Sequence, residues 1–122
     1  MVERHCSPME TESHGSAINV LQRGFNNLKS KYAVKLSNVG NPDHRQDSTK
    51  PLPDTTCGWA HCETLKECVE LVRLYISFYD LGGGNWNGGQ IYAHSVFVGR
   101  VSYNGRVWDT EKFTDSSKEI AV

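Results

Sequence analysis

The chain has 122 residues, of which 38% are hydrophobic and 22% are charged, as is ordinary for one globular domain. Its formal net charge of −1 argues against a protein that binds duplex nucleic acid through a basic surface. No apolar run approaches the roughly 20 residues that cross a bilayer, and the N-terminus lacks the apolar segment of a signal peptide. We therefore expect a cytoplasmic protein without a membrane partner, whose four cysteines are thiols.

The N-terminal part of the chain predicts a frayed segment followed by a helix. Residues 1–15 are polar and irregular, and Ser16 is a suitable cap for a helix that begins near Ala17. Tyr32–Leu36 is either the end of this helix or a short strand, and we favour the strand. The predicted apolar stripe of the helix, with spacings of three and four, consists of Ile18, Leu21, Phe25, Leu28 and Tyr32.

The segment Asn38–Thr56 predicts a long loop because it contains three prolines and many turn-forming residues. Loops of this length in a small domain are often functional or disordered. The loop also carries the pair His44–Arg45, which makes Arg45 a candidate phosphate contact. The whole loop is a candidate for closing over a ligand.

The remainder of the chain predicts one long helix and a small set of strands. Glu63–Tyr79 has one apolar face, and the glycines 82–84 are expected to end this helix. The periodicity then changes to two, which predicts the strands Gln90–His94, Val96–Tyr103 and Arg106–Asp109. Residues 16–110 are thus expected to form a single α+β domain, with two helices packed on a small antiparallel β-meander and residues 111–122 as a loose polar tail.

The sequence YNGR predicts a β-hairpin with Asn104–Gly105 as a two-residue turn. This turn would pair Tyr103 with Arg106, and Val101 with Trp108, on one side of the sheet. Arg106 would then lie on aromatic rings and keep hydrogen-bond donors for a phosphate or carboxylate. The alternative is a simple surface contact between cross-strand neighbours.

The segment LGGGNWNGGQ, Leu81–Gln90, places a tryptophan among glycines and asparagines. It lacks the lysine of a phosphate-binding Walker loop, and it follows a helix, which is the reverse of a dinucleotide-binding fingerprint. Asn85 and Asn87 offer amide contacts to a base or sugar, and Trp86 offers a flat stacking face. The sequence leaves open that Trp86 instead fills the core beside a sharp bend.

Few residues suggest metal binding or catalysis. Cys57, His61 and Cys62 are an alternative candidate set of metal ligands. The spacing in CGWAHC matches neither the C-x-x-C redox motif nor the usual zinc motif. No local motif pairs a nucleophile with a base. We therefore expect no catalytic residue and no cofactor.

The run DLGGGNWNGGQIY, followed by VGRVSYNGRVWD, resembles the small phage-encoded anti-Thoeris proteins of the first type over roughly residues 63–109. That family sequesters cyclic ADP-ribose signals made by bacterial TIR enzymes. The resemblance implies a homodimer with ligand sites at its interface, where Phe78, Asn87 and Arg106 would match the family's ligand contacts. The N-terminal half, with CGWAHC, carries no such resemblance.

The sequence thus supports three hypotheses. The first is a non-catalytic protein that binds a nucleotide-derived anion, with Phe78, Asn85, Trp86, Asn87, Tyr103, Arg106 and Arg45 as ligand contacts. The second is a protein-interaction module of a mobile genetic element, with Trp86, Trp59 and Tyr92 on an exposed patch. The third is a small metal-binding or hydrolytic protein.

Overall fold

The computed structural model describes residues 12–26 and 30–122, with side chains from residue 17 onward. The domain is α+β, as the sequence predicts, with two helices and one antiparallel sheet of six strands among these residues. No helix among the described residues has both the length and the apolar character needed to span a bilayer. The predictions for residues 1–11 and for Leu28 fall outside the described part of the chain.

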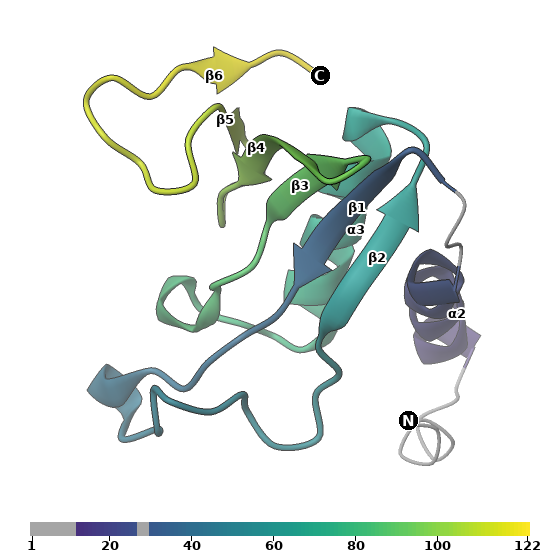
Figure 1. Ribbon diagram of the computed structural model, residues 1–122. Coiled ribbons are helices and arrows are strands. Elements are labelled where there is room, and N and C mark those ends of the chain that lie inside the picture. Colours follow the sequence, from purple (N-terminus) through teal and green to yellow (C-terminus); the bar gives the residue numbers. More distant parts are fainter. Residues whose placement is uncertain (1–11, 27–29) are drawn as a thin grey trace.

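The helices are α2, Glu12–Asn26, and α3, Leu65–Phe78. The sheet has the strand order β2-β1-β3-β4-β5-β6. Figure 1 shows α3 behind the sheet and α2 beside β2. The strands are β1 (Tyr32–Leu36), β2 (Gly58–Cys62), β3 (Gln90–Ala93), β4 (Val96–Val101), β5 (Val107–Trp108) and β6 (Glu119–Ile120).

The core lies between the sheet and α3 because each central strand alternates buried and accessible side chains. Val34 and Leu36 of β1 and Ile91 of β3 are fully buried, as are Val72 and Tyr75 of α3. Among the described residues, no helix covers the opposite face of the sheet. We call it the open face, and its members are Ala33, Lys35, Trp59, His61, Gln90, Tyr92, Phe97, Arg100 and Trp108.

Several helix and strand predictions are confirmed, and their boundaries differ in informative ways. Tyr32–Leu36 is a strand. The first helix begins at Glu12, so Ser16 lies inside it and not at its start. The second helix does not end on the glycine run, because Asp80 takes the left-handed conformation (φ 53°) and closes the last turn.

The hairpin register predicted from YNGR is wrong by one residue. Arg100 pairs with Trp108 and Val101 with Val107, so the loop has three residues, with Gly105 in the left-handed region (φ 85°). Burial explains the choice, since this register places both valines in the core. Arg106 is consequently opposite Ser102, whose N–H donates to the Arg106 carbonyl (2.8 Å).

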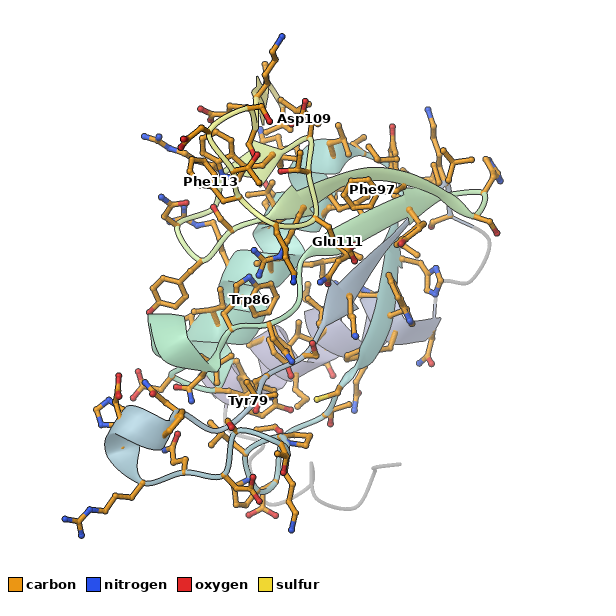
Figure 2. The ribbon with its side chains drawn as sticks, turned by 60° about the vertical axis from the view of Figure 1, so that its left-hand side comes forward. Tyr79, Trp86, Phe97, Asp109, Glu111 and Phe113 are labelled. Atoms are coloured by element: carbon orange, nitrogen blue, oxygen red, sulfur yellow. The ribbon has the colours of Figure 1, made fainter. Side chains whose placement is uncertain are left out.

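The C-terminal segment is not loose, in contrast to the expectation from its polarity. Glu119 and Ile120 form β6, which pairs with Trp108 and Val107 of β5. A hydrogen bond closes the intervening loop, because the Asp109 N–H donates to the Lys118 carbonyl (2.9 Å). The loop therefore belongs to the folded domain, and Figure 2 shows Glu111 on it beside the sheet.

The long loop after β1 is anchored by Asn38, which is 1% exposed. The Asn38 amide nitrogen donates to Thr55 Oγ1 (3.1 Å) and to the Tyr75 hydroxyl (2.9 Å), and its oxygen accepts from the Leu52 N–H (2.7 Å). The Tyr75 hydroxyl donates to the Thr56 carbonyl (2.7 Å), and burial raises the pKa of Tyr75, which keeps this donor protonated. One side chain thus ties the loop to α3.

Replacing this anchor is expected to destabilise the protein and release the loop. Asn38→Ala removes the three hydrogen bonds above and leaves the partly buried Leu52 N–H without its acceptor, so we expect a loss of about 2–4 kcal/mol in the free energy of unfolding. Urea denaturation measures this loss, and hydrogen exchange should report faster exchange in residues 39–56. Asn104→Ala, in the exposed hairpin loop, is the control and should cost less than about 1 kcal/mol. An equal effect of both substitutions would contradict the anchoring role.

Candidate ligand-binding site

Trp86 lies inside the molecule and offers no stacking face to a ligand. Its side chain is 7% exposed, its ring centroid is 6.1 Å from that of Tyr75, and its indole N–H donates to the Val101 carbonyl (3.1 Å). Figure 2 shows Trp86 in the middle of the molecule, among the side chains of other elements. Of the two alternatives that the sequence left open, this placement corresponds to the core tryptophan.

The other predicted residues of the glycine segment mostly hold the fold together. Asn85 is 7% exposed, and its amide donates to the Val39 carbonyl (2.9 Å) and to Gln46 Oε1 (3.0 Å). Asn87 is exposed, and its oxygen accepts from the Ser37 hydroxyl (2.7 Å). Phe78 packs against the core, with its ring 4.9 Å from that of Tyr79.

The predicted cationic contacts do not gather around Trp86. Arg106 and Arg45 are both exposed, and neither lines the hollows of about 970, 590 and 410 Å³. Tyr103 is 45% exposed and donates its hydroxyl to the Leu81 carbonyl (2.8 Å). It borders a hollow of about 410 Å³, and the arginine that lines this hollow with it is Arg100 and not the predicted Arg106.

The structure does not bring the candidate metal ligands Cys57, His61 and Cys62 together. Cys57 precedes β2 and Cys62 ends it, and at about 3.3 Å per residue these positions are roughly 16 Å apart along the strand. His61 faces the open side of the sheet, whereas Cys62 faces the core. Within residues 12–26 and 30–122, no group of three metal-ligating side chains is close enough to hold an ion.

A different set of side chains meets on the open face. Trp59 of β2, Tyr92 of β3 and Phe97 of β4 form a row, which we call the aromatic row, with ring centroids 5.7 Å and 5.6 Å apart. Ala33 lies opposite both His61 and Tyr92 in the register, and its small side chain allows the rings to meet across β1. Trp59 is 40% exposed, so part of its ring is available for stacking.

The open face contains a hollow of about 590 Å³, which we call the sheet hollow. Its volume falls within the roughly 300–1,000 Å³ typical of small-molecule sites. Its lining comes from β1, β2, β3, the β3–β4 turn and the C-terminal loop, and comprises Ser30, Lys31, Ala33, Lys35, Trp59, His61, Gln90, Tyr92, His94, Ser95 and Glu111.

Two polar atoms at the sheet hollow lack a partner among the described residues. Ser30 Oγ and Gln90 Oε1 are both buried and accept or donate no hydrogen bond there. A buried polar group without a partner costs about 1–3 kcal/mol, so such groups are usually satisfied by a ligand or by water. The hollow therefore combines aromatic faces with unused hydrogen-bonding capacity.

The charges around the sheet hollow favour an anion, although the chain as a whole has a net charge of −1. The lining contains the two lysines Lys31 and Lys35, and Glu111 is its only carboxylate among the described residues. The Lys31 ammonium lies 5.1 Å from the centroid of the Tyr32 ring. Two lysines against one carboxylate leave a local excess of positive charge.

The turn between β3 and β4 presents His94 to the sheet hollow. His94 (φ 51°) and Ser95 (φ 69°) both take the left-handed conformation, which matches the two-residue turn that joins paired Ala93 and Val96. Non-glycine residues are uncommon at such positions, and their strain is frequent at functional sites.

No protein-family model, curated protein or solved structure matches this chain.

Most residues of the sheet hollow are not among the predicted ligand contacts, because the sequence analysis considers CGWAHC as a metal or redox motif and not as a strand. The alternation in GWAHC, with Ala60 and Cys62 buried, places Trp59 and His61 on the other face. The same alternation in YAVKL places Lys35 there. A period-two pattern in both segments was the available signal.

Proposed function

We propose that this protein binds a nucleotide-derived anion in the sheet hollow without converting it. The observation that carries this proposal is the joint presence, around one hollow, of the exposed Trp59 ring, a pair of lysines and two unpartnered buried oxygens. The ring would stack on a base, the lysines would contact phosphate, and Gln90 with Ser30 would bond to base or sugar groups.

The ligand class in this proposal is a cyclic ADP-ribose-type signal, which follows from the resemblance of the C-terminal half to the anti-Thoeris proteins. Sequestration of such a signal would serve anti-defence in a phage or mobile element and would take place in the cytoplasm. The same resemblance supports a homodimer, and β2 is an edge strand that a second copy could extend. Sedimentation equilibrium of the purified chain tests the dimer.

Calorimetric titration with cyclic ADP-ribose and linear ADP-ribose tests the site. Loss of one stacking ring costs about 1–3 kcal/mol, so we expect Trp59→Ala to weaken binding by roughly 5- to 150-fold. Lys35→Ala should weaken binding of the phosphate-bearing ligands and leave adenosine binding unchanged. Because both residues are on the open face, these variants are expected to fold normally.

Matched controls separate the site from general effects. Phe113 is 65% exposed and meets Trp108 edge to face outside the sheet hollow, so Phe113→Ala should bind as the wild type does. Lys112→Ala removes an exposed lysine outside the hollow and should also be neutral. If the controls weaken binding as much as Trp59→Ala does, the sheet hollow is not the site.

A second candidate is a protein-interaction module, and the aromatic row favours it. A row of rings that spans β2 to β4 on an uncovered sheet face is also typical of a surface that binds a protein. The calorimetric titration separates the two candidates. The second candidate would replace the first if no nucleotide gave heat of binding in the titration and the wild type, but not Trp59→Ala, captured one protein.

A further inference from the structure

The end of β2 and the first turn of α3 bring two buried thiols together. Cys62 Sγ and Cys68 Sγ are 2.7 Å apart, and the two side chains are 5% and 0% exposed. Non-bonded carbon atoms are separated by about 3.5–4.0 Å at their optimum, and sulfur is the larger atom. The two sulfur atoms are thus closer than the usual separation of two non-bonded atoms in a packed core.

The local structure holds this pair in place. Thr64 caps α3, accepting from the Glu67 N–H (3.1 Å), and the Glu67 carboxylate accepts from the Glu63 N–H (2.9 Å). This reciprocal arrangement fixes the turn that joins Cys62 to Cys68. Little movement of either backbone is needed to join the two sulfur atoms.

The two cysteines differ in access. Cys62 borders a hollow of about 970 Å³ between α2, β2 and α3, whereas Cys68 does not line it. The hydrogen bond with Cys62, followed by burial, raises the pKa of Cys68, which therefore keeps its proton. A small reagent that enters this hollow reaches Cys62 first.

We propose that Cys62 and Cys68 form a reversible disulfide when the protein meets a low-molecular-weight disulfide such as oxidised glutathione. The Cys62 thiolate attacks one sulfur of the reagent, which forms a mixed disulfide and releases one glutathione thiolate. The Cys68 thiol then gives its proton to the released glutathione thiolate, and the resulting Cys68 thiolate attacks the Cys62 sulfur. The bond between Cys62 and the reagent breaks, and the second glutathione leaves as a thiolate that takes up the proton released by Cys62. The two protein thiols are oxidised by two electrons, and the reagent is reduced to two thiols that carry the protons away.

This inference is independent of the proposed ligand site and goes beyond the expectation that the four cysteines are thiols. The spacing C-x5-C is not a redox motif, so only the fold reveals the pair. A disulfide here would fasten β2, which carries Trp59 and His61, to α3.

Peptide mapping of the full chain tests the pair directly. The protein is incubated with oxidised glutathione, quenched in acid, alkylated and cut with trypsin, which cleaves after Lys66 and Arg73. We expect the peptide that contains Cys62 to be linked to Glu67–Arg73, two of the four thiols to be protected, and dithiothreitol to reverse both changes. The apparent Tm should rise by about 5–10 °C on oxidation, as for a native-geometry disulfide that constrains the unfolded chain.

Cys57 shares the tryptic peptide of Cys62, so the mapping is repeated with Cys57→Ser. This exposed residue should be dispensable, and the linked peptide should persist. Cys68→Ala should abolish the link, leaving Cys62 with a mixed glutathione disulfide. Alkylation of all four thiols after oxidation, or a link that is lost with Cys57→Ser, would overturn the proposal.

Discussion

Gly89→Ala is expected to lower the free energy of unfolding by about 3–5 kcal/mol, a large share of the 5–15 kcal/mol typical of a domain. Gly89 has φ 99°, where an alanine is strained, and its added Cβ would overlap the Val101 carbonyl oxygen. The Gly89 N–H donates to the Lys35 carbonyl (2.7 Å), and its carbonyl accepts from the Val101 N–H (2.9 Å). The residue therefore cannot move away without breaking contacts to β1 and β4.

The matched control is Gly83→Ala in the same glycine segment. A Cβ at Gly83 would meet only Tyr103 Cδ2, at an ordinary contact distance of 3.8 Å, and its φ is not positive. Alanine there reduces the freedom of the unfolded chain, so the variant should be neutral or more stable by up to about 1 kcal/mol. Urea denaturation of both variants measures the difference. Equal stability of the two would mean that Gly89 is not held between the strands.

Trp86→Ala is expected to cost about 3–5 kcal/mol in the free energy of unfolding because it empties a large part of the core. It also leaves the Val101 carbonyl without its indole donor. Trp86→Phe retains most of the packing and should cost about 1–2 kcal/mol. Thermal or urea denaturation measures both values.

The same pair of variants distinguishes a core residue from a ligand contact. Because Trp86 is buried away from the sheet hollow, Trp86→Phe should bind nucleotide within about twofold of the wild type. Trp59→Ala should show the opposite behaviour, with weak binding and near-normal stability. A strong loss of affinity in Trp86→Phe would restore Trp86 as a stacking residue.

Local periodicity in the sequence predicts the second helix well, whereas it misplaces the start of the first helix and counts Tyr32 of β1 in that helix's apolar stripe. Leu65–Phe78 has a complete apolar face, and Tyr32–Leu36 alternates cleanly. The hairpin register could not be predicted from YNGR alone. There the demand to bury Val101 and Val107 together outweighs the preference of Asn104–Gly105 for a two-residue turn.

The candidate site was harder to predict because its residues are far apart in the chain. Trp59 and Tyr92 meet only after β1 is inserted between β2 and β3. The glycines around Trp86 do allow another group to approach the backbone closely. The groups that approach it belong to the neighbouring strands and not to a ligand. Gly88 and Gly89 lie against the backbones of Lys35 and Val101.

An NMR titration of the isotopically labelled chain with cyclic ADP-ribose tests the proposed binding site most directly. We predict saturable shifts of the backbone amides in residues 30–35, 59–61 and 90–95, which surround the sheet hollow. Shifts confined to the glycine segment and Arg106, or no shift at about 1 mM ligand, where binding stronger than roughly −4 kcal/mol would be visible, would contradict it.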